Sequence, residues 1–311
     1  MIQEDFQFLS ADKKTTIHGM KWLPDRECTK AVLQITHGMQ EYIGRYTEFA
    51  QFLAGKGIAA VGHDHLGHGD SVASPSEYGY FTDSRPSDTL IKDMHTVRKQ
   101  IQKEYKDLPY FMLGHSMGSY MLRKYITKYP KHLSGAVIVG TGSMPDVLMK
   151  AGMGICGFLG RVHGWHYKST LVKKLSFLGS YRRYDLTGTD VGNTWLTKET
   201  CIAERYYKDP KCRFDFTVNG YYGLMEAVYY DNQARNIAKI PNGLPLLLLS
   251  GDQDPVGDMG KGVTKVYRQY QAAGMTDVTL KLYKNDRHEI LNETDRRDVY
   301  ADIYTWICNR I

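Results

Sequence analysis

The chain has 311 residues, of which 40 are Lys or Arg and 34 are Asp or Glu, and its formal net charge is +6. A hydrophobic share of 42% and an aromatic share of 12% exclude a disordered chain, and so mild a charge argues against a nucleic-acid partner. Five widely spaced cysteines without a CxxC pair indicate reduced thiols instead of a disulfide framework.

The N-terminal segment MIQEDFQFLS carries acids where a signal peptide needs bases, and it has no apolar centre. Apolar runs such as LPLLLLSG (244–251) are too short to cross a bilayer. The sequence therefore predicts a soluble, cytoplasmic protein without an integral membrane segment.

The first predicted elements are FQFLS (6–10) and TTIHGMKW (15–22), whose alternating pattern is typical of an antiparallel hairpin at a sheet edge. Nearly continuous apolar strands follow, in alternation with amphipathic helices. This rhythm predicts one α/β domain over 1–311 whose mostly parallel sheet is covered by helices on both faces. The strands are predicted at 31–36, 58–64, 109–114, 134–140, 245–251 and 278–283, and the helices at 46–57, 86–105, 116–130, about 260–273 and about 293–309.

Residues about 141–235 interrupt this alternation with Gly-rich and aromatic stretches, and we interpret them as an insertion between two core strands. Within it, GMGICG (152–157) matches GxGxxG. A dinucleotide site needs a strand before that motif and an acid about 20 residues after it. Neither is present, because VLMKA precedes the motif and the next acid is Asp185. The stretch is interpreted as a closely packed, Gly-rich helix.

The segment GHSMG (114–118) matches GxSxG and joins a predicted strand to a predicted helix, which is the context of a nucleophile elbow. Ser116 is the candidate nucleophile, exposed at the carboxyl edge of the sheet and at a helix N-terminus. There the amides and the helix dipole favour developing negative charge. The alternative is a serine that only caps the helix.

A nucleophilic serine needs a base and an orienting acid, which follow it in the chain order Ser, acid, His in this kind of fold. His288 lies in a loop after a strand and is the candidate base. Asp254 is the candidate acid because it precedes Pro255, where the chain turns. The alternatives are that Asp252 or Asp258 form turns or caps, and that His288 is an exposed loop residue.

The oxyanion hole is predicted from two backbone N–H groups. One belongs to Met117, which follows the nucleophile, and the other to Met39 in the loop HGMQEY (37–42). Glu41 and the nearby Arg45 and Tyr46 are expected to fix this loop, and His115 is expected to pack at the elbow.

The segment GHDHLGHGD (62–70) offers a metal alternative through His63, His65 and His68. It differs from the usual HxHxDH pattern, because Gly67 stands where that pattern has Asp. We interpret the segment as a tight scaffolding turn in which Asp64 and His68 form hydrogen bonds, and predict no metal.

The ordered set HGMQEYIGRY, DHLGHGDS, GHSMG, GDQDP and HEILNE resembles the α/β-hydrolases of the lysophospholipase and monoacylglycerol-lipase group over nearly the whole chain. The insertion resembles the cap of that group at WLTKE (195–199) and YYKDPKCRFDFT (206–217). The resemblance implies an α/β-hydrolase fold with a cap and cofactor-free hydrolysis of acyl esters such as monoacylglycerols or lysophospholipids. It implies these site residues: Ser116 as nucleophile, Asp254 as acid, His288 as base, and Met39 and Met117 as oxyanion donors.

Thioester or peptide hydrolysis remains an alternative, because the same machinery serves both bonds, and so does a non-catalytic binding protein of this fold. The insertion also predicts transient contact with a lipid interface, because its cations interleave with apolar residues and Asp146 is the only acid between 146 and 184. The alternative is a solvated face over a packed core. The cations are Lys150, Arg161, Lys168, Lys173, Lys174, Arg182 and Arg183, and Met144, Met149 and Met153 are candidates to line an acyl pocket.

Overall fold

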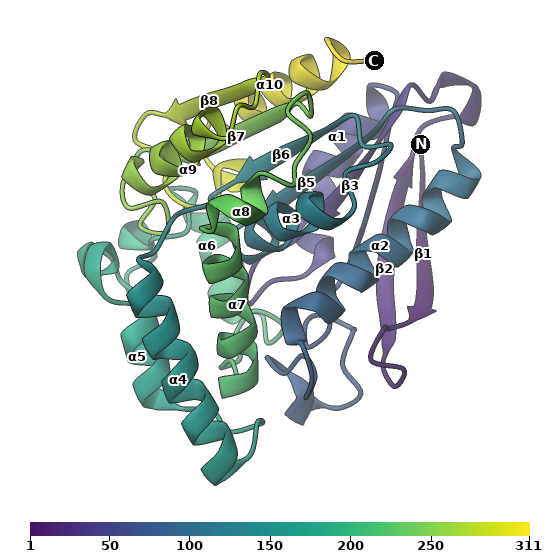
Figure 1. Cartoon of the computed structure of the whole chain (residues 1–311). Helices are drawn as coiled ribbons and strands as arrows, with labels where there is room; N and C mark the ends of the chain where they lie inside the picture. The colour runs from purple at the N-terminus through teal and green to yellow at the C-terminus, as the bar shows by residue number, and fades with distance from the viewer.

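The computed structural model describes residues 1–311, apart from the side chain of Arg26. The described residues form one eight-stranded sheet in the order β1-β2-β4-β3-β5-β6-β7-β8, with helices on both faces (Figure 1). The strands β1 and β2 form an antiparallel hairpin at the edge, β2 is antiparallel to β4, and the other pairs are parallel. The predicted fold class is confirmed.

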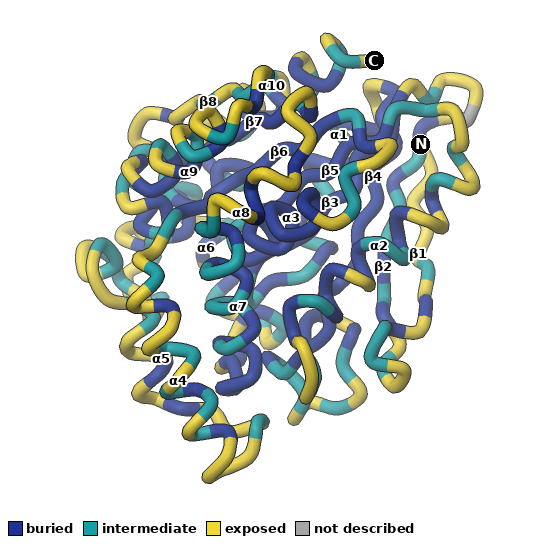
Figure 2. Tube along the Cα trace, viewed as in Figure 1, coloured by how far each residue is buried: buried dark blue, intermediate teal, exposed yellow. Residues whose placement is uncertain are grey.

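The inner strands form where most of five or six successive residues are apolar, because both faces of these strands are covered. Every residue of β3 to β7 is buried, as the dark blue sheet in Figure 2 shows. The strands are β1 (Ile2–Leu9), β2 (Thr16–Leu23), β3 (Ala31–Thr36), β4 (Ile58–His63), β5 (Tyr110–His115), β6 (Gly135–Val139), β7 (Leu246–Gly251) and β8 (Val278–Tyr283).

Two apolar cores lie on the two faces of the sheet. One joins Leu33 and Phe111 to α1 and α10, and the other joins Val32 and Met112 to α2, α3 and α9. Every strand and helix predicted for the core is present, with ends shifted by about three residues or fewer. The helices are α1 (Thr47–Gly55), α2 (Pro86–Glu104), α3 (Met117–Lys128), α4 (Asp146–His163), α5 (Thr170–Ser176), α6 (Thr200–Lys208), α7 (Val218–Asp231), α8 (Ala234–Ile237), α9 (Lys261–Ala272) and α10 (Arg296–Cys308).

The order of winding reverses between β3 and β5, which are neighbours in the sheet although β4 lies between them in the sequence. The loops that leave the carboxyl ends of β3 and β5 therefore diverge around a crevice, the usual ligand position in open α/β sheets. The loops after β7 and β8 open on the same edge, because these strands are parallel to β5.

The segment between β6 and β7 contains α4 to α8 and adds no strand to the sheet. Its helices α4 and α5 stand away from the sheet at the lower left of Figure 1 and are largely exposed in Figure 2. GMGICG lies inside α4, where a Cβ on Gly152 would lie 3.0 Å from Met225 Cε on α7, so this glycine allows close helix packing. No helix among the described residues has both the length and the apolar character needed to cross a membrane.

The two connections of this segment to the sheet are joined to each other. Ser143 Oγ donates to Asn232 Oδ1 at 3.1 Å, and Asn232 Nδ2 donates to Met144 O at 2.7 Å and to Asp146 Oδ1 at 3.0 Å. Arg123 of α3 donates to Gly142 O at 2.9 Å below this junction. The chain therefore leaves the sheet and returns to it through one hydrogen-bonded junction.

Candidate active site

Ser116 lies between β5 and α3, at the turn predicted as a nucleophile elbow. Its backbone dihedrals, φ 52° and ψ −119°, are a strained combination that costs a non-glycine residue about 1–3 kcal/mol. Ser116 N–H donates to Val139 O at 3.0 Å, and Ser119 Oγ donates to Ser116 O at 2.6 Å, which holds the turn. The Ser116 side chain makes no capping bond to α3, so the alternative of a simple cap does not describe it.

The two glycines of GHSMG are required by close backbone packing. A Cβ on Gly114 would lie 2.8 Å from the carbonyl carbon of Gly118, and one on Gly118 would lie 2.7 Å from that of Thr36. Both distances are shorter than side-chain carbons tolerate, so only glycine lets β5, α3 and β3 approach this closely. The elbow is consequently pressed against the end of β3.

Asp254 and His288, the predicted acid and base, are brought together from the loops after β7 and β8. His288 Nδ1 donates to Asp254 Oδ1 at 3.0 Å, and both side chains are buried. Val256 N–H also donates to Asp254 Oδ1, at 2.8 Å, and Ser250 Oγ donates to Oδ2 at 3.3 Å. His288 Nε2 is buried and has no hydrogen-bond partner among the described residues. One ring nitrogen is thus fixed by a carboxylate, and the other is free to take a proton.

The other candidate acids have different partners. Asp252 accepts from Asn285 N–H at 2.8 Å and from Gln253, as a turn former does. Asp258 is exposed and accepts from Ser180 Oγ at 2.9 Å. Of the three acids, only Asp254 contacts His288. The ring of His115, next to Ser116, lies 4.7 Å from the His288 ring, so the elbow and the predicted base are adjacent.

The predicted oxyanion donors flank Ser116. Met117 N–H opens α3 and Met39 N–H lies in the loop after β3, and in the described chain neither has an acceptor. A Cβ on Gly38 would lie 2.9 Å from Ser116 Cβ, so this loop runs directly beside the serine.

His37 orients the peptide that carries the Met39 N–H. His65 N–H donates to His37 Nε2 at 2.8 Å, so Nδ1 carries the proton and donates to Gly38 O at 2.8 Å. Because C=O and N–H point in opposite directions in a trans peptide, this bond directs the Met39 N–H away from His37.

Glu41 is the buried anchor of the loop after β3. It accepts from His115 Nδ1 at 2.9 Å, from Tyr46 OH at 2.9 Å, from Arg45 at 3.0 Å and from Gly38 N–H. Burial would raise the pKa of Glu41, but the charges of His115 and Arg45 outweigh it and hold that pKa far below its ordinary range. These contacts agree with the loop-fixing role predicted for Glu41, Arg45 and Tyr46.

Arg45 extends this network to the loop of His288. Its guanidinium donates to both oxygens of Glu289 at 2.7 Å and lies 4.9 Å from the ring of Tyr206 on α6. Burial would raise the pKa of Glu289, but the Arg45 charge outweighs this effect and holds the pKa below its ordinary value. The pair ties together the loop after β3, the loop after β8 and the helical segment.

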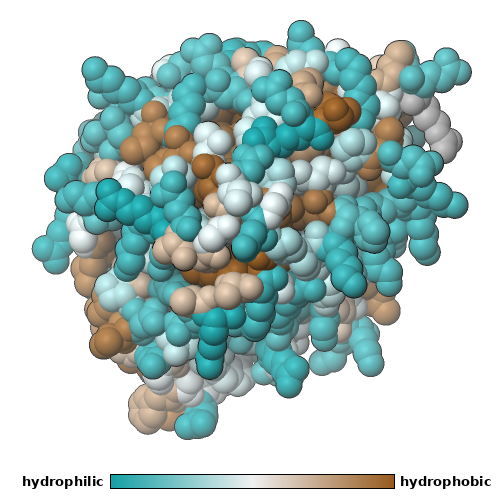
Figure 3. All heavy atoms as spheres, turned by 45° about the horizontal axis from the view of Figure 1, so that its top comes forward, coloured by the Kyte–Doolittle hydropathy of each residue, from teal (hydrophilic) through white to brown (hydrophobic). Residues whose placement is uncertain are grey.

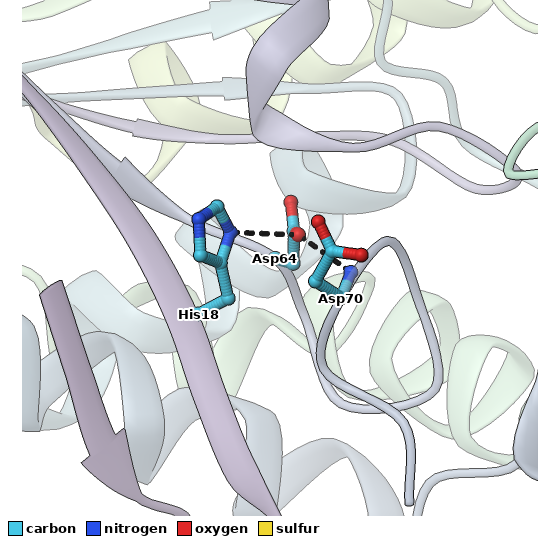
Figure 4. Close-up of side chains that lie close together, drawn as sticks. All are labelled: His18, Asp64 and Asp70. Carbon is cyan, nitrogen blue, oxygen red and sulfur yellow. Dashed lines mark hydrogen bonds and ion pairs between the residues drawn. The ribbon is translucent and has the colours of Figure 1, made fainter. Parts of the chain in front are cut away.

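The turn in GHDHLGHGD is organised by Asp64 (Figure 4). Its carboxylate accepts from His18 Nδ1 at 3.1 Å, from Ile43 N–H at 2.8 Å and from Asp70 N–H at 2.8 Å. Burial would raise the pKa of Asp64. The bond from His18 and the bonds from the surrounding N–H groups outweigh this effect, so the pKa lies below its ordinary value. His68 Nδ1 bonds Leu66 O at 3.3 Å. Asp64 and His68 thus form the hydrogen bonds predicted within the turn.

The metal alternative gains no support from the arrangement of the histidines. Among the described residues, the ligand atoms that converge are those of His18, Asp64 and Asp70, and not those of His63, His65 and His68. Both Asp64 oxygens already accept the hydrogen bonds described above. The three histidines of the motif are fully buried, and the rings of His63 and His65 lie edge to face at 5.0 Å.

Two residues beside the site were not predicted from the sequence. Glu289 pairs with a residue 244 positions away, and Trp195 stacks on the His288 ring with centroids 4.9 Å apart. The available signals were an acid directly after the candidate base and an aromatic residue in WLTKE. Neither signal predicts the residue that Glu289 or Trp195 contacts, because those contacts depend on the fold.

Comparisons with known proteins place this geometry in context. The chain is 28% identical to the mouse (Mus musculus) monoglyceride lipase, over 91% of this chain and 84% of that protein. It is 26% identical to a monoacylglycerol lipase of Mycolicibacterium smegmatis, over 93% of this chain and 92% of that one. A crystal structure of a carboxyl esterase from Bacillus coagulans superposes with a TM-score of 0.88 at 28% identity, covering 100% of this chain and 99% of the other.

A family described as Hydrolase_4, serine aminopeptidase, S33, matches residues 27–295, from the start of the parallel strands to the last helix. The match includes the elbow, the Asp254–His288 pair and the loop that carries Met39. Because it spans most of the chain and the ordered site within it, the protein belongs to this family of serine hydrolases.

Proposed function

We propose that this protein hydrolyses carboxylic esters through an acyl-serine intermediate formed on Ser116. The observation that carries the proposal is the buried Asp254–His288 pair, whose Nε2 has no partner among the described residues and whose loops open at the same edge of the sheet as the strained Ser116. The relatives named as lipases and the esterase structure support ester chemistry.

The proposed reaction has two steps. Ser116 Oγ attacks the ester carbonyl carbon while His288 Nε2 takes the hydroxyl proton, and Asp254 stabilises the imidazolium through Nδ1–H. The tetrahedral oxyanion is bound by the N–H groups of Met39 and Met117, each worth about 3 kcal/mol of transition-state stabilisation. Its collapse expels the alcohol, which receives the proton from His288. Water, deprotonated by His288, then releases the acid and restores the Ser116 hydroxyl.

We propose monoacylglycerols or lysophospholipids as the substrate class, because both hydrolysed bonds join one acyl chain to a polar alcohol. Two relatives named for lipase activity on monoglycerides or monoacylglycerols support this class. Met144, Met149 and Met153 remain candidates to line an acyl pocket; Met149 is buried near the start of α4, Met153 is half-buried and Met144 is exposed.

We further propose that residues about 141–235 act as a cap on a single α/β domain and touch lipid interfaces transiently. On α4 and α5, Val147, Phe158 and Leu171 are 76%, 65% and 57% exposed. Brown side chains gather at the lower left of Figure 3, toward the region of these helices. Lys150, Arg161 and Lys174 are also exposed there, whereas Asp146 is held by Asn232 and Gln233. A basic, amphipathic surface of this kind suits anionic head groups.

The cap proposal is tested by sedimentation with phosphatidylcholine vesicles that contain or lack phosphatidylglycerol. We expect binding that needs the anionic lipid, weakens in high salt and falls in V147S/F158S. The matched control is Leu9→Ser, which removes an equally exposed apolar residue from β1 on another side of the molecule. Binding that ignores lipid charge and salt would overturn the proposal.

The enzymatic proposal is tested with p-nitrophenyl esters of increasing chain length, a monoacylglycerol and a lysophospholipid. Wild-type protein should hydrolyse them and react with a fluorophosphonate probe, and Ser116→Ala should do neither while keeping its melting temperature. The description of the matched family names an aminopeptidase, so aminoacyl p-nitroanilides are included in the same substrate panel. Acyl thioesters are included because the same machinery can cleave them. Faster turnover of either would replace the ester assignment. A wild-type chain that neither labels nor turns over any substrate would be a binding protein.

A cytoplasmic location remains a prediction. It is supported by the cysteines, which form no disulfide within the described chain.

A further inference from the structure

Trp195, in the helical segment between β6 and β7, lies against the predicted catalytic base. Its ring is stacked on the His288 imidazole, with centroids 4.9 Å apart and planes inclined by 29°. Its carbonyl oxygen accepts the His288 backbone N–H at 3.3 Å. Trp195 therefore contacts both the ring and the backbone of His288.

The stretch around Trp195, residues 192–198, is fastened along the loop that carries His288, and we call it the strap. Its backbone and side chains are bonded to residues 286–293 on both sides of the stacked pair, so the position of Trp195 is set mainly by the loop of His288. The bonds are Arg287 to Thr194 O at 2.6 Å and to Gly192 O at 3.0 Å, Glu289 N–H to Leu196 O at 2.7 Å, Thr197 Oγ1 to Asn292 O at 2.9 Å, and Lys198 Nζ to Asp286 at 2.7 Å.

Two further aromatic residues pack against the indole. Tyr181 and Phe177 meet Trp195 edge to face, at 5.3 Å and 6.3 Å between ring centroids. Tyr184 OH donates to Gln253 O at 2.7 Å, beside Asp254. The indole is thus set in a fixed orientation before any substrate is bound.

The groups around His288 include a carboxylate and a second histidine, and their charges indicate what the indole face of Trp195 contributes. Asp254 faces it at Nδ1, and His115 faces it with a ring 4.7 Å away whose Nε2 bonds His288 O. Burial lowers the pKa of His115, but the Glu41 charge outweighs it and raises that pKa, so this neighbour favours its cationic form. A second imidazolium on His288 would be repelled by it. An indole face attracts a cation, most strongly where water is excluded.

We propose that Trp195 is a positioning residue for His288: it holds the imidazole plane at the elbow, and its π face stabilises the imidazolium that forms during acyl transfer. The inference rests on the proposed function, because it assigns Trp195 a role in that reaction. It also gives the strap a role distinct from that of α4 and α5, which face solvent.

The kinetic test compares Trp195→Leu with Trp195→Phe on a short p-nitrophenyl ester. Leucine keeps an apolar cover over His288 and removes the π face, whereas phenylalanine keeps a π face. We expect kcat to fall about 3- to 30-fold in Trp195→Leu with KM little changed, and Trp195→Phe to keep most of the activity. Equal kcat in the two variants, or a change in KM alone, would overturn the proposal.

A spectroscopic test needs no substrate, so it separates this inference from the proposed function. A protonated imidazole in contact with an indole quenches its fluorescence. Acidification should therefore lower the emission of the wild-type protein in a step that is absent in Trp195→Phe and in His288→Gln. The step is expected even if no ester is hydrolysed, in which case only the proposed function fails. A step of the same size in both variants would show that the two rings are not stacked.

Discussion

The orienting role proposed for Asp254 depends on one hydrogen bond, from His288 Nδ1 at 3.0 Å. Asp254→Asn keeps the volume and removes the charge, so the imidazole loses its preferred tautomer and its counter-charge. We expect kcat to fall about 10³- to 10⁴-fold with little change in KM. The control is Asp252→Asn, two residues away in the same loop, which should retain nearly full kcat. Similar losses in both variants would mean that the loop, and not the triad, was disturbed.

Glu41 provides a second prediction for single residues, because one buried carboxylate accepts four hydrogen bonds. Glu41→Gln leaves His115 without the carboxylate it bonds and Arg45 with Glu289 alone, and breaking a buried pair of this kind costs about 3–5 kcal/mol. We expect a lower urea midpoint and, through the loosened Met39 loop, a lower kcat. Glu48→Gln, whose partners Arg296 and Arg297 lie near the surface, is the matched control and should change both little. An unchanged urea midpoint in Glu41→Gln would contradict the anchoring role.

At the scale of elements, the helical segment is attached to the core through the junction around Asn232. Asn232→Ala removes the bonds to Ser143, Met144 and Asp146 at once. We expect faster hydrogen exchange in α4, measured by mass spectrometry, with β3, β5 and β6 unchanged, because the helix would open locally without unfolding the sheet. Gln271→Ala on α9 removes an exposed amide and serves as the control. Unaltered exchange in α4 would mean that packing against α7 alone holds the segment.

At the scale of the whole molecule, two sets of buried groups act on stability in opposite directions as the pH falls. Burial lowers the pKa of His37, His63 and His68 to about 4. The unfolded chain takes up these protons first, so their effect is a loss of stability between pH 6.5 and 4. Burial raises the pKa of Asp93 to about 7 and that of Asp231 to about 8. The folded chain takes up these protons first, so acidification adds stability.

The opposition can be measured by removing one member of each set. As the pH falls from 6.5 to 4.5, His63→Gln should gain stability relative to wild type. The variant lacks the imidazole that takes up a proton more readily in the unfolded chain than in the folded one. Over the same range Asp231→Asn should lose stability relative to wild type. Each difference should change by up to about 1.4 kcal/mol per pH unit, read from urea unfolding. A pH-independent difference would mean that the group titrates alike in both states.

The strands and the elbow were predictable because each depends on local sequence. A strand buried on both faces must be mostly apolar, as AVLQIT and PLLLLSG are, and the elbow needs glycines on either side of Ser116. Asp254 could be proposed as the acid because it precedes Pro255, where the chain turns. The contacts of Glu289 and Trp195 depend on which loops the sheet order brings together. That order includes the reversal between β3 and β5, and no local pattern of the chain encodes it.

The junction between residues 143–146 and Asn232 has a consequence for how this scaffold can diverge. The chain leaves the core and rejoins it at nearly one point. The entropic cost of closing the loop therefore rises only slowly with the length of the segment between these two connections. Whole helices can then be lengthened, shortened or exchanged there while β6 and β7 keep their register. New substrate ranges are thus accessible by replacing one contiguous stretch, provided that the replacement still brings an aromatic residue to His288.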